Sequence, residues 1–147
     1  MPSAWQIRGH PPQDWKSPST AENLRLVHNL PKLTPGAGSV LLNIKAAALN
    51  YRDLLLVAHS PAYPALAVPD LVPCADAAGV VEAVGPGSKW KVGDRVLVNS
   101  SKWVDGPAPR YDEAESIGSG ALDGTLREYA VFVSTQVLRV GSGGKWW

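Results

Sequence analysis

This 147-residue chain has few of the Cys and His residues that bind zinc and similar metal ions. Cys74 is the only cysteine, which excludes both a disulfide scaffold and a zinc lobe built from four cysteines. The three histidines, His10, His28 and His59, show none of the spacings at which histidines share a metal ion. The residue types and their spacing therefore predict no metal site.

A polar group, Asn50-Tyr51-Arg52-Asp53, separates a long alternating segment from an apolar one. The side-chain oxygen of Asn50 can cap a short helix, and Asp53 would then lie near the positive end of the helix dipole. This pattern approximates a capping box, although Asp is shorter than the usual Glu or Gln. Arg52 can pair with Asp53 or with Asp76, or it can face water.

The glycine-rich segment 118–124 (GSGALDG) is the one candidate for a phosphate-binding loop. Its glycines miss the spacing of the dinucleotide fingerprint, and an acidic segment rather than a strand precedes it. We therefore predict no phosphate site there.

The charge balance disfavours nucleic acid and membrane surfaces as partners. The 14 Lys and Arg residues against 13 Asp and Glu leave a net charge of +1, without the basic excess that such partners attract. An oligonucleotide-binding barrel is disfavoured for the same reason, and Trp90 and Trp103 are expected to pack in the fold. No stretch approaches the ~20 apolar residues of a membrane span, and the N-terminus lacks the apolar core of a secretory signal. We expect a cytoplasmic protein.

Short strands joined by Gly- and Pro-rich turns predict a mostly-β fold with short helices. Residues 40–48 alternate with a period of two, as in a strand with one buried face, and a helix beginning after Asn50 should stop by Pro61. Gly79 is expected to allow a bulge or a close backbone approach. Gly85, Gly87 and Gly93 can take positive φ angles, which β-branched residues resist. Further strands are predicted at 4–8, 24–30, 77–84, 95–99, 127–134 and 136–140.

Three blocks of sequence occur in the order and at the spacing of one family. They are ALNYRDLL at 48–55, VPCADAAGVVEAVGPGSKWKVGDRV at 72–96 and GALDGTLREYAVF at 120–132. With them the chain resembles the N-terminal catalytic domain of the medium-chain dehydrogenase/reductase superfamily, which includes alcohol dehydrogenases and quinone oxidoreductases. The resemblance spans about 39–140 and implies a GroES-like, partly open β-barrel.

The resemblance places this chain in a zinc-independent branch. Zinc-dependent members carry a catalytic Cys in the first block and a His, often followed by Glu, in the second. Asn50 takes the Cys position here, and Ala75 with Asp76 takes the His-Glu position. An amide and a methyl group cannot replace the thiolate and imidazole that suit zinc. Cys74 lies one residue away from the ligand position and is expected to be a small buried residue.

Family positions also suggest the site residues. Asn50 and Tyr51 would meet the nicotinamide ring and the substrate, and Tyr51 is the candidate catalytic residue because its hydroxyl could relay a proton. Asp53 and Asp76 are the other candidates to face substrate or cofactor. The alternative is structural: Asn50 as a cap, Tyr51 as a packed ring, Asp53 as a helix-start charge and Asp76 as a partner of backbone donors.

The expected domain is 1–140, and 141–147 (GSGGKWW) looks like a non-native tail. Family members place a Rossmann domain after this barrel, which supplies the glycine fingerprint for NAD(P)H, and we expect that domain to be absent here. The implied function is the substrate and catalytic part of a zinc-independent NAD(P)H-dependent oxidoreductase acting on a carbonyl, quinone or enoyl substrate. We expect the chain to bind NAD(P)H weakly, to be inactive alone and to self-associate into a homo-oligomer. The alternative is a truncated, non-enzymatic GroES-like scaffold or binding module.

Overall fold

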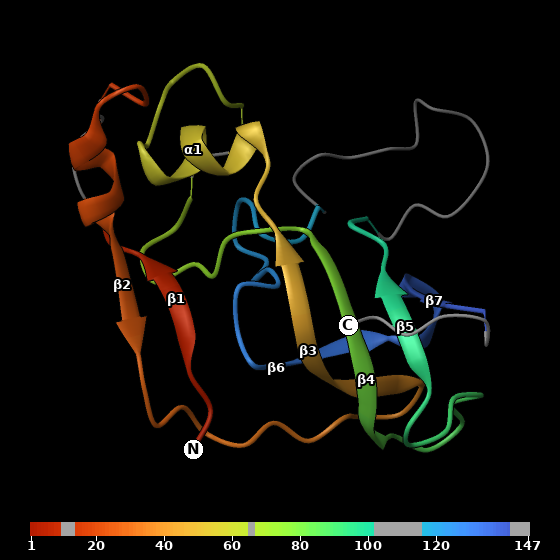
Figure 1. Cartoon of the computed structure of the whole chain (residues 1–147). Coiled ribbons are helices and arrows are strands. Elements are labelled where there is room, and N and C mark those ends of the chain that lie inside the picture. The colour runs from red at the N-terminus through yellow and green to blue at the C-terminus, as the bar shows by residue number, and fades with distance from the viewer. Residues whose placement is uncertain (10–13, 65–66, 102–115, 142–147) are drawn as a thin grey trace.

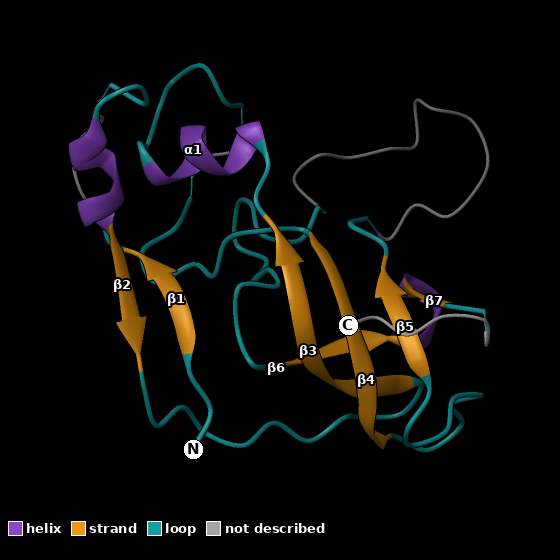
Figure 2. Ribbon diagram, in the orientation of Figure 1, coloured by secondary structure: helices purple, strands orange, loops and turns teal. Residues whose placement is uncertain are grey.

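The alternating segment after Gly38 becomes β3 (Ser39–Ala48), the longest strand of a five-stranded antiparallel sheet. The computed structural model describes residues 1–9, 14–64, 67–101 and 116–141. In this sheet the strand order is β6-β3-β4-β5-β7, so the sheet stays open (Figures 1 and 2). The remaining elements are β1 (Ala4–Ile7), η1 (Pro18–Asn23), β2 (Leu24–Val27), α1 (Tyr51–Val57), β4 (Asp76–Val84), β5 (Arg95–Val98), β6 (Tyr129–Val133), η4 (Ser134–Gln136) and β7 (Val137–Arg139).

A separate two-stranded sheet, β1 paired with β2, lies beside β3, and α1 lies above both sheets in the view of Figure 1. Strands dominate Figure 2, and the predicted mostly-β, partly open GroES-like fold is confirmed. The structure contains no helix, in the residues it describes, that is long and apolar enough to cross a membrane.

Two apolar clusters hold these elements. The larger cluster lies against the five-stranded sheet and includes Val40, Trp90 and Phe132. Trp90 is 6% exposed, and its indole N–H donates to the Ser134 carbonyl at 3.1 Å, so its predicted packing role is confirmed. The second cluster joins the buried face of α1 to β1 and to the segment before β4, through Ile7, Leu55, Leu56, Val57, Tyr63 and Leu71. It fixes the helix whose first turn carries the candidate site.

Four glycines singled out in the sequence occupy positions where a side chain would clash or the backbone would be strained. Gly79 faces a register shift in β3, and a Cβ there would lie 2.7 Å from the Asn43 carbonyl oxygen. Gly87 and Gly93 have positive φ angles of 75° and 90°. Gly85 does not, and it is needed because a Cβ there would lie 1.7 Å from the Gly36 carbonyl oxygen.

Backbone conformation sets several boundaries differently from the sequence prediction. The strand expected at 24–30 ends at Val27, two residues before Asn29 with its φ of 61°. α1 ends at Val57, and His59, with a φ of 49°, turns the chain before Pro61. The helix η1 was not predicted. Trp103 and most of the predicted tail lie outside the described residues.

Candidate functional site

The first turn of α1 is capped by a buried carboxylate. One oxygen of Asp53 accepts the backbone N–H of Asn50 at 2.8 Å, and the Asp53 N–H donates to the Asn50 carbonyl at 3.0 Å. The predicted capping position of Asp53 is therefore confirmed. Asp53 is only 3% exposed, so its carboxylate lies beneath the surface and contacts backbone groups rather than solvent.

The side chain of Asn50 reaches across to the first residue of β4. Its amide Nδ2 donates to Asp76 Oδ2 at 2.7 Å. The two residues meet because β3 and β4 are paired so that Ala48 lies opposite Asp76. Both side chains are exposed, so an ordered amide–carboxylate pair lies at the surface where two strands and a helix converge.

Asp53 also links this pair to the segment before β4. Its second oxygen accepts the backbone N–H of Cys74 at 3.1 Å, and the Arg52 Nε lies 3.8 Å from that oxygen. One carboxylate therefore holds Asn50 on the helix and Cys74 two residues before Asp76. This link adds to the pairing of β3 with β4, which brings Asn50 to Asp76.

The Arg52 side chain does not pair with Asp76, and it does not face solvent. Its guanidinium donates to Ser116 Oγ at 2.9 Å and to the Ile117 carbonyl. Its side chain is 18% exposed. Arg52 thereby connects α1 to the segment 116–125, which lies beside the site.

Cys74 lies at the junction of these segments. It is fully buried and has a φ of 72°. Burial, helped by the negative charge of Asp53, raises the pKa of its thiol to about 12, so the thiol stays protonated at neutral pH. The prediction of a small buried residue is confirmed.

The glycine-rich segment 118–124 packs around the Cys74 backbone. A Cβ at Gly118 would lie 2.3 Å from the Cys74 carbonyl oxygen, and one at Gly124 would lie 1.9 Å from it. The N–H groups of these glycines are also occupied, on Leu122 O at 2.8 Å and on Val72 O at 2.7 Å. Gly118 and Gly124 thus serve close packing against the Cys74 backbone.

Tyr51 is exposed at the surface, with 60% of its area accessible. Its ring meets Trp15 edge to face, with centroids 5.1 Å apart and planes at 84°. Leu49 and Leu54 beside it are also exposed, which gives the site an apolar rim. Trp15 was not predicted, because nothing local in its Pro-rich surroundings relates it to a residue 36 positions away.

The structure thus brings together Asn50, Asp53 and Asp76, and the exposed Tyr51 follows Asn50 in the chain. Within the described ranges, no three His, Cys, Asp or Glu side chains are grouped so that they could hold a metal ion. The arrangement offers amide and hydroxyl donors, an exposed carboxylate and an aromatic surface. Such groups can bind and polarise a small polar molecule.

The sequence matches the family model of the alcohol dehydrogenase GroES-like domain over residues 36–142. This chain belongs to that family. Among its relatives, a zinc-type alcohol dehydrogenase-like protein of Schizosaccharomyces pombe is 37% identical over 102 residues, which cover 68% of this chain and 28% of the relative. A trans-enoyl reductase of a Penicillium species is 36% identical over 109 residues, covering 74% of this chain and 25% of the enzyme.

Solved structures of the GroES-like family have the same fold. The quinone oxidoreductase of Pseudomonas syringae superposes with a TM-score of 0.65 at 27% identity, over 99% of this chain and 35% of that protein. The cobalt- and zinc-bound alcohol dehydrogenase of Pyrobaculum aerophilum gives a TM-score of 0.68 at 27% identity, over 93% of this chain and 41% of that protein. The chain therefore spans between a quarter and two-fifths of the length of these relatives.

Proposed function

We propose that this chain is the substrate-binding and catalytic part of a zinc-independent, NAD(P)H-dependent oxidoreductase. Its reaction would be hydride transfer between nicotinamide and a carbonyl, a quinone or an activated alkene. The observation that carries the proposal is the 2.7 Å hydrogen bond between Asn50 Nδ2 and Asp76 Oδ2. By the resemblance, Asn50 takes the position of a metal-binding Cys and Asp76 that of the Glu that often follows the metal-binding His, and here the two side chains bind each other.

The side chains at this place do not suit zinc. Zinc in catalytic sites prefers thiolate and imidazole ligands. Asn50 offers an amide and Ala75 a methyl group, while the Cys74 thiol is buried and has a pKa raised to about 12. No step of the proposed reaction therefore passes through a metal ion.

The described residues can contact nicotinamide, but they form no cradle for its pyrophosphate. Dinucleotide-binding folds use parallel strands and a glycine turn whose N–H groups face the phosphates. Every strand pairing of the described residues is antiparallel, and the N–H groups of Gly118 and Gly124 bind carbonyls of this chain. When bound, the cofactor supplies the hydride chemistry. We infer that this chain does not hold it tightly.

Asn50 and Tyr51 would act on the substrate oxygen. The Asn50 amide has two N–H groups, and its bond to Asp76 fixes the orientation in which the second can donate to an oxygen that gains negative charge. The exposed Tyr51 hydroxyl can relay a proton to the same oxygen. Asp53 is buried and acts through Asn50 as a positioning residue.

The substrate classes follow from the relatives and from the site. One relative is named for trans-enoyl reduction, and one structural neighbour for quinones. Carbonyls, quinones and enoyl groups share an oxygen that becomes negatively charged when the substrate accepts a hydride. Hydrogen-bond donors such as Asn50 and Tyr51 stabilise that charge where no metal does so.

Titration of the ¹⁵N-labelled chain with reduced nicotinamide mononucleotide tests the proposal by NMR. We expect millimolar binding, with shifts concentrated at residues 49–54 and 75–77. Asn50→Ala should weaken binding about fivefold, the effect of one hydrogen bond. The matched amide variant Asn43→Ala, whose side chain bonds Tyr129 in the middle of β3, should leave binding unchanged. Shifts scattered over the surface and equal for both variants would contradict the proposal and favour a non-enzymatic scaffold.

A further inference from the structure

We infer that Trp15 is a positioning and specificity-determining residue of this site. It fixes the ring of Tyr51, and the two rings together form an aromatic wall. This wall selects substrates whose reactive carbonyl belongs to a planar ring. The inference rests on the proposed function, because it assumes that substrate binds beside Tyr51. It adds a residue that lies outside the family match at 36–142.

The geometry of the aromatic pair is the first observation. The Trp15 and Tyr51 rings meet edge to face, with centroids 5.1 Å apart and planes at 84°. This is a favoured arrangement for two aromatic rings. Tyr51 is 60% exposed, so little else restrains its ring, and contact with Trp15 limits the orientations it can adopt.

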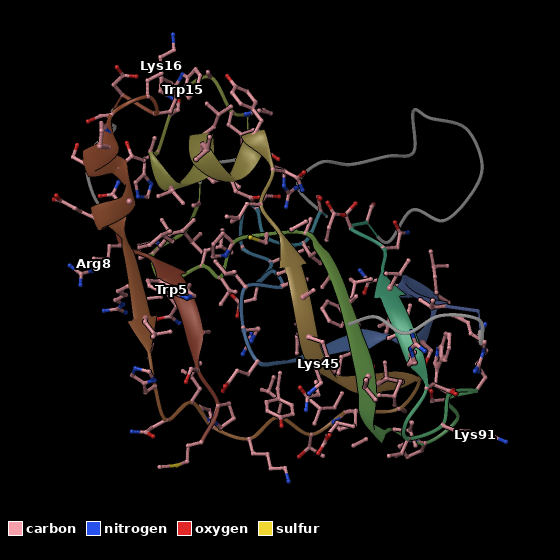
Figure 3. The ribbon with its side chains drawn as sticks, viewed as in Figure 1. Trp5, Arg8, Trp15, Lys16, Lys45 and Lys91 are labelled. Carbon is pink, nitrogen blue, oxygen red and sulfur yellow. The ribbon has the colours of Figure 1, made fainter. Side chains whose placement is uncertain are left out.

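Trp15 is itself well anchored. Its ring is half-buried and packs on the cluster that includes Leu55 and Leu56 of α1. Figure 3 shows Trp15 and Lys16 together on the segment above α1. That segment is a turn closed on Asp14, whose carboxylate accepts the Lys16 N–H at 3.0 Å and whose carbonyl accepts the Ser17 N–H at 2.8 Å. Because Trp15 is held by both the apolar cluster and a hydrogen-bonded turn, it can orient the ring of Tyr51.

The chemistry of the wall favours a planar, electron-poor ring. The faces of aromatic rings carry negative potential, so the exposed phenol ring of Tyr51 attracts a quinone-like ring in an offset stack. The Lys16 Nζ lies 5.1 Å from the Trp15 ring centroid and places positive charge at the rim. Asn50 precedes Tyr51 in the chain, so a ring stacked on Tyr51 can direct its carbonyl to the amide. A saturated ketone of similar size gains no stacking energy.

The test compares two carbonyl probes on the full chain by NMR. Duroquinone is planar and has no free ring position for thiol addition, and cyclohexanone is saturated. The wild type should bind duroquinone roughly tenfold more tightly, with shifts at Tyr51. Trp15→Leu should reduce this preference about three- to fivefold, whereas Trp15→Phe, which keeps an aromatic ring, should reduce it by less than about twofold. The control Trp5→Leu alters an exposed tryptophan on β1 and should change nothing.

A second readout needs no ligand. Nuclear Overhauser contacts should join the indole of Trp15 to the Tyr51 ring, and the Tyr51 ring signals should shift in Trp15→Leu but not in Trp5→Leu. An unchanged probe preference in folded Trp15→Leu, or Tyr51 signals identical to the wild type, would overturn the inference and leave the proposed function standing. Probe shifts absent from residues 50–51 of the wild type would overturn both.

Discussion

Gly124→Ala is expected to unfold the chain or to lower its free energy of unfolding by at least about 4 kcal/mol, most of what a small domain has. The new Cβ would lie 1.9 Å from the Cys74 carbonyl oxygen, 2.5 Å from the Pro73 carbonyl oxygen and 2.7 Å from the Gly118 Cα. All three are backbone atoms, which cannot move aside as the end of a side chain could. Urea denaturation followed by circular dichroism measures the change.

Gly36→Ala is the matched control. A Cβ there has no neighbour within 4 Å, and its φ is not in the positive range. Its stability should stay within about 0.5 kcal/mol of the wild type. Equal stability of Gly124→Ala and Gly36→Ala would show that the segment 118–124 does not pack on the Cys74 backbone as described.

Asp53→Ala should lower the free energy of unfolding by about 3 kcal/mol, in the range found when one member of a buried charged network is removed. The substitution leaves the N–H groups of Asn50 and Cys74 without the acceptor they now share, and it removes the carboxylate beside Arg52. It should also release Asn50 from Asp76. The NMR signals of the Asn50 side-chain amide report this change. They should move toward the positions that they have in the variant Asp76→Asn, where an amide replaces the carboxylate that accepts the bond.

Asp70→Asn controls for the loss of a carboxylate that is also ion-paired. Asp70 pairs with Arg25 at the surface and its side chain is 57% exposed, so the loss should be within about 0.5 kcal/mol. Asn50 signals that stay at their wild-type positions in folded Asp53→Ala would show that Asp53 stabilises the helix without setting the geometry of the site.

Local patterns predicted the elements of this fold well. The period of two in 40–48 is β3, and the polar group at 50–53 does start a helix, with Asn50 at its N-cap and Asp53 in the capping box. The meeting of Asn50 with Asp76 could be anticipated only through the family resemblance. No pattern in the sequence states that the end of β3 pairs with the start of β4.

The residues that escaped prediction act across long sequence separations. Gly124 needs its lack of a side chain because the chain brings it against Cys74, 50 residues earlier, and Gly85 because it meets Gly36. Arg52 has an acidic neighbour in the sequence, Asp53, yet it also binds Ser116 and Ile117, more than 60 residues away. Trp15 reaches Tyr51 only because the second apolar cluster draws its segment onto α1. Such contacts are set by tertiary packing, which composition and spacing do not encode locally.

The central proposal is that the described residues form one side of a hydride-transfer site and contain no binding site for the pyrophosphate of the dinucleotide. Titration of the purified 147-residue chain with NADPH, combined with a duroquinone reduction assay, tests it most directly. The account predicts no saturable binding at micromolar NADPH and no quinone reduction above the rate without protein. Micromolar NADPH affinity together with steady quinone turnover would contradict it.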